Sequence, residues 1–427
     1  MPVSDSGSTA GGMSVSLVSL LALGHCVAFV DRNLPAVVAP LLKSSLGLTD
    51  AQFGLLDGPA FAVLYVVGML ASWPLASSRH RLRLLAGCIA TWALGMTAFA
   101  LGTSFDMLLV ARALVGLGQA AFVPLALGLI VERSAPQWRA RSIAVFTAAS
   151  VAGRSLALLL GGAVLALLTR WVPVSGLAHW RLLFLVMAAP NLVLIVLLLR
   201  RTEQLQALPA PAAVFGQMLA LFRQRPRLML MYFCGAGASV LVVQTVGAWA
   251  PSILHREDGL VPATAAFAFG LALLVAAPLG HLLAGTLIDM RRKRVTPMAI
   301  VACALLLAVP LLWAVPRSTS ATAACGLLAL TSLVGGTAAV AALAGLPLML
   351  PVALRDAGLR LFLIFITVFG VGMGPFIAGL ISDGRGLGGH GLSSALCTVC
   401  VGAAVFGAVS ALLARSGWRR AVMETAG

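Results

Sequence analysis

Apolar runs long enough to cross a membrane follow one another along almost the whole chain, separated by short polar breaks. A helix needs about 20 apolar residues to span the hydrocarbon core of a bilayer. The pattern therefore predicts an all-α membrane protein with twelve transmembrane helices. We place them over residues 13–41, 52–76, 84–102, 107–131, 142–169, 180–199, 228–250, 262–288, 297–315, 320–350, 358–382 and 391–414.

The longest polar interruption lies near the middle of the chain, over residues 200–227. It contains arginine pairs, glutamines and the proline-containing stretch LPAPAA, a composition typical of a linker. We therefore expect two pseudo-symmetric six-helix bundles, formed by residues 1–199 and 228–427, with a cytoplasmic linker between them.

Composition and charge support a membrane location. Of the 427 residues, 60% are hydrophobic and 10% are charged, and the mean hydropathy of +1.03 excludes a soluble fold. The formal net charge of +16 could indicate nucleic-acid binding, but 20 of the 29 Lys and Arg residues lie in alternate short loops and in the C-terminal tail. Loops rich in Lys and Arg are cytoplasmic. We expect a multi-pass protein of the cell inner (plasma) membrane with both termini in the cytoplasm and no nucleic-acid partner.

A short basic motif follows the eighth predicted helix, where the chain reads GTLIDMRRKR. Gly285 lets two helices approach closely, and Asp289 at a helix end faces basic residues such as Arg294 across a cytoplasmic seam. The loop after the second helix keeps the basic residues but has Ser77 where the acid belongs. We therefore predict a cytoplasmic gate motif formed by Gly285, Asp289 and Arg294, with a weaker contact in the first half.

Two motifs make the chain similar to the major facilitator superfamily: GTLIDMRRKR, and RALVGLGQA over residues 112–120 in the fourth helix. Within that superfamily, the chain resembles the spinster-like proteins over nearly its full length. The segments that carry this second resemblance are residues 30–32 (VDR), 48–56 (LTDAQFGLL), 61–65 (FAVLY), 180–181 (WR), 248–251 (AWAP), 370–375 (GVGMGP) and 380–383 (LISD).

The resemblance implies inverted three-helix repeats within each half and secondary transport by alternating access. It also implies export or exchange of lysolipid-type amphiphiles, with a response to protons in bacterial relatives. Two positions depart from the family pattern, because Gln119 stands where an acid is usual and Arg154 stands where a small neutral residue is usual. If the missing acid carries protons in relatives, coupling in this chain rests on another group or is absent.

Ionisable residues inside the apolar runs are the candidates for proton coupling. A charged side chain costs about 2.5–3.5 kcal/mol at a helix centre on insertion scales, so each is expected to face a cavity or a partner. Asp31 is the first candidate, because a carboxylate in a partly dry cleft gains or loses a proton as its surroundings change. Its alternative is a structural pair with Arg32 or Arg112. Asp57 is the second candidate, and its alternative role is a structural ion pair with Arg112. His25 is the third candidate, and its alternative role is that of a hydrogen-bonded packing residue.

Six polar residues are candidates for substrate binding. A guanidinium binds a phosphate or a carboxylate in a two-pronged geometry. Arg112 and Gln119 are seven residues apart and share one face of the fourth helix. Each arginine also has an alternative role. Arg32 could extend from its helix end toward the membrane surface, Arg112 could serve only to hold helices together, and Arg154 could be bound by a protein acid or by backbone carbonyls. The two candidates in the second half either line the opposite wall of the cavity or bond their own helix backbone. The candidates are Arg32, Arg112, Gln119, Arg154, Gln244 and Thr331.

The sequence thus predicts a secondary active transporter, proton-coupled or exchange-driven, for an amphiphilic or small organic anion, lysolipid-like molecules included. We expect the substrate to be negatively charged because the three intramembrane arginines outnumber the two acids, Asp31 and Asp57, by one. The alternatives are a drug or organic-acid carrier of another facilitator branch and a non-transporting membrane enzyme or receptor. No HExxH, clustered His and Asp, or phosphate-binding glycine motif occurs, so we expect no enzyme activity, no metal and no cofactor. The expected partners are the substrate and membrane lipids, and the expected state is a monomer.

Overall fold

The computed structural model describes residues 15–72, 78–173, 176–201, 214–290, 295–384 and 391–426. These residues are helical apart from short connections, and no strand occurs among them. Within this described part, twelve helices or helix pairs are long and apolar enough to cross a membrane. The prediction of an all-α membrane protein with twelve spans is confirmed.

Five of the six spans of the first half are slightly longer than the predicted apolar runs, whereas the second is described only over Asp50–Ala71 of the predicted 52–76, because residues 73–77 lie outside the described part. The six spans are built from α1 (Val15–Leu46), α2 (Asp50–Asp57), α3 (Pro59–Ala71), α4 (Arg81–Leu101), α5 (Phe105–Ala120), α6 (Phe122–Arg133), α7 (Arg139–Trp171) and α8 (His179–Leu199).

The second half begins after the expected linker segment, inside which lies a short helix, α9 (Val214–Gln224). Its spans are built from α10 (Pro226–Arg256), α11 (Pro262–Met290), α12 (Pro297–Ala314), α13 (Ala321–Gly345), α14 (Arg355–Phe365), η5 (Ile366–Gly372), α15 (Met373–Gly384) and α16 (Gly391–Ala426). Three short 3₁₀ turns complete it, η2 (Val315–Arg317), η3 (Pro347–Met349) and η4 (Val352–Leu354).

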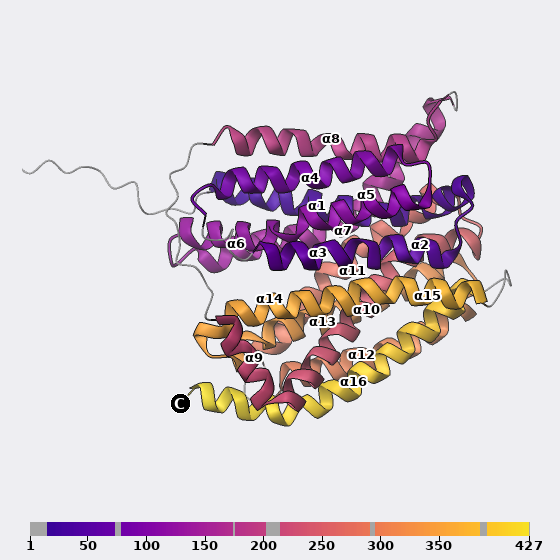
Figure 1. Ribbon diagram of the computed structural model, residues 1–427. Helices are drawn as coiled ribbons and strands as arrows, with labels where there is room; N and C mark the ends of the chain where they lie inside the picture. The colour runs from indigo at the N-terminus through magenta and orange to yellow at the C-terminus, as the bar shows by residue number, and fades with distance from the viewer. Residues whose placement is uncertain are drawn as a thin grey trace, which may run out of the picture.

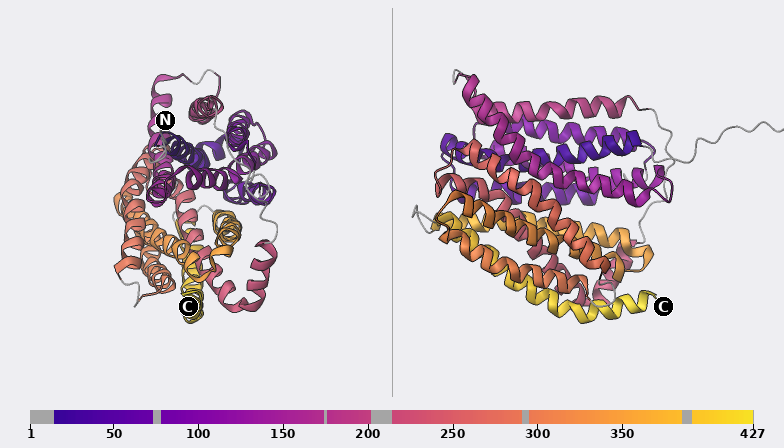
Figure 2. Two further views of the ribbon diagram at one scale, coloured as in Figure 1. Left: turned by 90° about the vertical axis from the view of Figure 1, so that its left-hand side faces the viewer. Right: turned by 180° about the vertical axis from the view of Figure 1, so that it is seen from behind.

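The helices gather in two groups that lie side by side, one from each half of the chain (Figures 1 and 2). In the first group α1 packs on α7, and α4 packs on α5 and α8. In the second, α10 packs on α16 and α12 on α13. The two most extensive seams between the groups are α7 against α11 and α2 against α15, and α1 also contacts α10 and α3 contacts η5. We call the end of the bundle that holds Asp50 the Asp50 end, and the end that holds α9 and the C-terminus of α16 the linker end.

Local capping fixes the turn that places Asp50. Gly47 has φ +65°, the left-handed conformation that favours glycine after the end of a helix. The Thr49 side chain then accepts a hydrogen bond from the backbone N–H of Gln52, and the Gln52 side chain accepts one from the backbone N–H of Thr49. This reciprocal capping box starts α2 at Asp50.

Two spans change their helical geometry where they face each other. The second span breaks between α2 and α3 at Gly58, which is followed by Pro59 at the first helical position of α3. The eleventh span contains a π-helical segment, η5, that ends at Gly372. A side chain at Gly58 would collide with the backbone carbonyl of Gly372, so the two irregular points are in contact.

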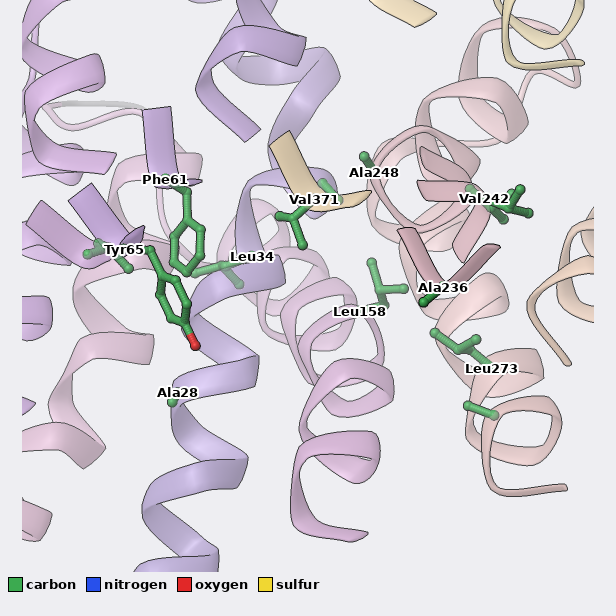
Figure 3. Close-up of a cluster of buried hydrophobic side chains, with 14 of the residues drawn as sticks. Ala28, Leu34, Phe61, Tyr65, Leu158, Ala236, Val242, Ala248, Leu273 and Val371 are labelled. Atoms are coloured by element: carbon green, nitrogen blue, oxygen red, sulfur yellow. The ribbon is translucent and has the colours of Figure 1, made fainter. Parts of the chain in front are cut away.

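An apolar core runs through both groups of helices. Figure 3 shows Phe61 and Tyr65 of α3 with their rings turned toward α1, near Leu34 and Ala28. The two ring centroids are 5.4 Å apart and both residues are buried. The guanidinium carbons of Arg32 and Arg112 lie 4.2 and 5.5 Å from the centroid of the Phe61 ring.

Candidate functional site

Asp31 lies inside the N-terminal half, where it projects from α1 toward α8 and α4. Its side chain is fully buried, and its Oδ2 accepts a 2.8 Å hydrogen bond from the Asn191 side chain. The amide oxygen of Asn191 accepts in turn from the indole N–H of Trp92 at 2.7 Å. The other carboxylate oxygen of Asp31 has no hydrogen-bond partner among the described residues. Asp31 is therefore a buried acid with one oxygen fixed by neighbours of its own half.

Arg32 points in a different direction from Asp31, because successive residues of a helix lie about 100° apart. Its guanidinium carbon lies 4.2 Å from the centroid of the Phe61 ring, 5.6 Å from that of Phe29 and 5.9 Å from that of Tyr65. The side chain is half-buried, and within the described ranges it forms no ion pair. Aromatic faces attract the cation without neutralising its charge.

Arg112 is buried, and its Nε and Nη2 are bonded to neighbouring residues. It forms an ion pair with Asp57, with 3.2 Å between Nη2 and Oδ1. The same Nη2 donates to the backbone carbonyl of Arg32 at 2.6 Å, and Nε donates to the backbone carbonyl of Leu56 at 3.3 Å. The ion pair that the sequence left open for Arg112 and Asp57 is present, and it ties α5 to the end of α2.

Gln119 and His25 contact backbone carbonyls within the N-terminal half. The Gln119 amide donates to the carbonyl of Ala28 at 2.8 Å and is buried. His25 Nδ1 lies 2.8 Å from the carbonyl of Phe146, and the two rings are stacked with centroids 4.2 Å apart. Both side chains hold α1 against its neighbours, as the packing alternative for His25 requires.

Arg154 bridges the two halves. It projects from α7, and its Nη2 donates a 2.5 Å hydrogen bond to the backbone carbonyl of Val243 on α10. A side chain at Gly247, one turn further along α10, would occupy the position of this guanidinium. The Arg154 Nε is buried and has no hydrogen-bond partner in the described part of the chain. Arg154 therefore keeps hydrogen-bonding capacity that the protein does not use.

The two candidates from the C-terminal half lie on α10 and α13. Gln244, next to Val243, is half-buried. Thr331 is buried, and its hydroxyl donates to the backbone carbonyl of Leu327 one turn earlier at 2.8 Å. This is the hydrogen bond that the backbone-bonding alternative predicts for Thr331, and a role in substrate binding stays a prediction.

The charges near the middle of the bundle sum to a positive value. The Asp57 carboxylate interacts electrostatically with Arg112, Arg32 and Arg154. Three guanidiniums and one ionised carboxylate give 3 − 1 = +2, and adding an ionised Asp31 gives +1. In a medium of low dielectric constant such an excess attracts an anion more strongly than it does in water.

A second polar cluster lies at the Asp50 end, across the seam between α2 and α15. Asp50 forms ion pairs with Lys43 and with Arg256 of α10, and it accepts a hydrogen bond from the Ser382 hydroxyl at 2.8 Å. Asp383 accepts hydrogen bonds from the first backbone N–H groups of α2. Asp50, Ser382 and Asp383 lie in the segments that resemble spinster-like proteins, but the sequence analysis assigned no role to any residue of this cluster. The capping box at Thr49 was the available signal, because it places Asp50 at a helix start.

The gate motif lies at the linker end. Gly285 is half-buried, but an added side chain there would meet no described atom within 4 Å, so the close helix approach expected at this glycine is not observed among the described residues. Asp289 is exposed in the last turn of α11. Arg294 lies outside the described residues, as does Ser77 in the first half. Among the residues that the structure describes, no group of three or more His, Cys, Asp or Glu side chains could hold a metal ion.

An apolar pocket of about 260 Å³ lies in the C-terminal group, between α9, α10 and the eleventh span. It is lined by Phe222, Leu230, Phe233, Leu361, Ile364, Phe365, Val368 and Phe369.

Twelve spans in two groups, with buried charges at their interface and a polar cluster across one end, define a polytopic membrane carrier. Comparison with protein families gives the same result, because the model of the Major Facilitator Superfamily matches residues 21–355. The chain belongs to the major facilitator superfamily and is a secondary transporter of organic substrates.

Individual relatives agree with this assignment and with the spinster-like resemblance. The chain is 30% identical over 426 residues to an "MFS-type efflux pump" of Mycolicibacterium smegmatis, covering 96% of this chain and 94% of the relative. It is 28% identical over 254 residues to human "Protein spinster homolog 1", covering 58% of this chain and 47% of that protein. The fold is similar, with a TM-score of 0.84 and 21% identity, to an inward-facing, unoccupied crystal structure of a bacterial homolog of the human lysosomal transporter Spinster. That comparison covers 98% of this chain and 99% of the other.

Proposed function

We propose that this carrier moves an amphiphilic organic anion across the inner membrane, and that Arg32 and Arg154 bind its head group. The observation that carries the proposal is that neither guanidinium forms an ion pair among the described residues, although both interact with the central acid Asp57. Arg32 packs against aromatic faces, and Arg154 has a buried Nε without a hydrogen-bond partner among the described residues. A phosphate or carboxylate would supply the missing acceptor oxygens.

Arg112 takes a structural role in this proposal. Its Nε and Nη2 donors are bonded to Asp57 and to two backbone carbonyls, and only 2% of the side chain is exposed. A substrate that displaced Asp57 would leave a buried carboxylate without a partner, which is strongly unfavourable. Arg112 therefore fixes α5 against α2 and adds to the positive potential without contacting the substrate.

The apolar part of the substrate is assigned to the pocket beside α10. Phe233 lines this pocket, and Val243, which Arg154 contacts, lies ten residues further along the same helix. At 1.5 Å per residue the two positions are about 15 Å apart along the helix axis. A molecule with a charged head and an apolar tail of that length would use both environments.

We place proton coupling, if the transport cycle uses it, at Asp31. This is the one candidate acid that is fully buried and not paired with an arginine in the described residues. Asp57 is engaged by Arg112, and His25 is engaged in packing. Exchange of one anion for another is the alternative source of energy.

Charge placement gives the proposed orientation. With residues 1–199 and 228–427 as the two bundles and the 200–227 linker in the cytoplasm, both termini are cytoplasmic. The Asp50 end then faces away from the cytoplasm, and the gate motif of Gly285, Asp289 and Arg294 lies on the cytoplasmic side. The protein would work as a monomer in contact with membrane lipids and without enzymatic activity.

Binding of matched ligands tests the proposal. The ligands are lysophosphatidylglycerol and a neutral monoacylglycerol of the same chain length, and the variants are Arg154→Gln, Arg154→Lys, Arg32→Gln and Arg32→Lys. A hydrogen bond to a charged group contributes about 1.5–3 kcal/mol, so each Gln variant should weaken binding of the anionic ligand by about tenfold or more. Binding of the neutral ligand should change little, and the Lys variants should retain part of the preference. An unchanged preference in all four correctly folded variants would remove both arginines from the substrate site.

Efflux is the second candidate function, because the relative from Mycolicibacterium smegmatis that matches nearly the whole chain is named an efflux pump, and a drug is the substrate class to test for it. A neutral or cationic drug does not need the two arginines. Equal transport of such a drug by wild type and by both Gln variants would favour this function over transport of an anion.

A further inference from the structure

We infer that Asp50 and Asp383 form a reciprocal lock that holds the two halves together at the Asp50 end, and that opening of this end requires the lock to break. The inference rests on the proposed alternating-access function, but its test uses neither substrate nor transport.

Asp50 supplies the contribution of the N-terminal half. Its carboxylate receives two hydrogen bonds from Nη1 of Arg256, at 2.9 Å to Oδ1 and 2.7 Å to Oδ2. The Ser382 hydroxyl donates to Oδ2 at 2.8 Å. Arg256 belongs to α10 and Ser382 to α15, so both contacts cross from one half to the other. Only 4% of the Asp50 side chain is exposed, which shields these charge-assisted bonds from water.

Asp383 supplies the contribution of the C-terminal half. Its Oδ1 accepts from the backbone N–H of Asp50 at 2.9 Å, and its Oδ2 accepts from the backbone N–H of Ala51 at 2.8 Å. The first N–H groups of a helix have no partner within the helix, and a carboxylate there is favoured by the helix dipole. The acid of each half therefore satisfies donors that belong to the other half.

Lys43 makes the lock reversible. It belongs to the same half as Asp50 and forms an ion pair with it. When the halves separate, Arg256 and Ser382 leave with the C-terminal half, but Lys43 stays beside Asp50. The carboxylate is therefore not left as an unpaired charge, which would make separation strongly unfavourable.

The seam beneath the lock is built from backbone contacts. A side chain at Gly379 would collide with the carbonyl of Asp50, and one at Gly54 would collide with the backbone of Pro375 and Phe376. Small residues at a helix interface allow such close approach. With no side chains interleaved at these points, the polar contacts at the end of the seam are the specific bonds that must break before α2 and α15 can part.

Hydrogen–deuterium exchange of the purified full-length protein tests the lock. The variants are Asp50→Asn, Arg256→Gln and Asp383→Asn. The matched control is Glu257→Gln, because Glu257 accepts a hydrogen bond from the backbone of Ser393 and this contact stays within the C-terminal half. The lock predicts that exchange in residues 47–57 and 376–384 increases by about tenfold or more in each variant but not in the control. Exchange in residues 59–71 and 355–369, toward the linker end, should decrease at the same time.

The decrease at the linker end separates a shift between two global states from local fraying, because only a shift closes one end as it opens the other. Faster exchange confined to residues 47–57 and 376–384 would overturn the inference, as would no change at either end. The double variant Asp50→Asn/Arg256→Gln provides a second criterion. Its effect should be no larger than the larger single effect, whereas additive effects would show that the two residues do not act as a unit.

Discussion

The Arg154 guanidinium on α7 donates a hydrogen bond to the backbone carbonyl of Val243 on α10, with 2.5 Å between nitrogen and oxygen, and thereby joins the two halves of the transporter. The space for the guanidinium exists because residue 247 is a glycine. Together these residues place a positive charge at the boundary that an alternating-access cycle must rearrange.

Gly247→Ala should displace Arg154 from this position. We expect weaker binding of an anionic ligand in the alanine variant, by about tenfold if one charge-assisted bond is lost. Ligand titration of purified protein measures the effect. Adding Arg154→Gln to Gly247→Ala should then change affinity little, because the first substitution has already moved the guanidinium. Independent, additive losses would contradict this account. Gly216→Ala serves as the control, because no atom of the described residues lies within 4 Å of the added methyl group.

Breaking the buried pair between Arg112 and Asp57 should destabilise the protein. Removal of one partner of a buried ion pair costs about 3–5 kcal/mol, because the other charge remains without compensation. Thermal unfolding in detergent should therefore show a large decrease in melting temperature for Asp57→Asn and for Arg112→Gln. The double variant should recover part of the loss. If the single variants melt as wild type does, the pair is not structural and Arg112 returns to the list of substrate-binding candidates.

Asp31→Asn should abolish any dependence of transport rate on pH while leaving substrate binding measurable. The variant keeps the size of the side chain and a hydrogen-bond acceptor for Asn191, but it cannot release a proton in the measured range. Initial transport rates between pH 5 and 8 in proteoliposomes test this. A wild-type pH profile in the variant would exclude Asp31 and make Asp57 the next candidate.

Protease protection tests the proposed orientation. We expect the 200–227 linker to be cleaved in inverted membrane vesicles and to be protected in intact cells, because alternate basic loops predict a cytoplasmic linker. Cleavage of the linker from outside intact cells would contradict both the orientation and the assignment of the Asp50 end to the outer side.

Apolar run length predicted the twelve spans, because a bilayer imposes a minimum length on every crossing helix. It did not predict the break at Gly58 or the π-helical segment ending at Gly372, since each lies inside a segment that was predicted as one uninterrupted span. Periodicity also could not orient Asp31. Its helix is apolar on nearly every side, so the sequence gives no indication that Asp31 faces Asn191 and Trp92 within one half.

Contacts between residues far apart in the chain could not be predicted from the sequence either. The residues Asp50 and Ser382 are 332 positions apart, and each looks like an ordinary polar residue at the end of an apolar run. Arg32, Arg112 and Arg154 differ in how many hydrogen bonds and ion pairs they form, and this depends on which carbonyls and acids surround each one. Only the fold shows that Arg112 is paired while Arg32 rests on an aromatic ring.

Transport into sealed proteoliposomes tests the central claim most directly, since only a transporter moves a label across an otherwise intact bilayer. The label is a short-chain lysophosphatidylglycerol, and protein-free vesicles and the double variant Arg32→Gln/Arg154→Gln serve as controls. We predict that wild type moves the anionic label faster than both controls and moves a neutral monoacylglycerol of equal chain length no faster than protein-free vesicles do. Equal movement of both labels by wild type and the double variant would contradict the account, as would a wild-type rate for the anionic label equal to that of protein-free vesicles.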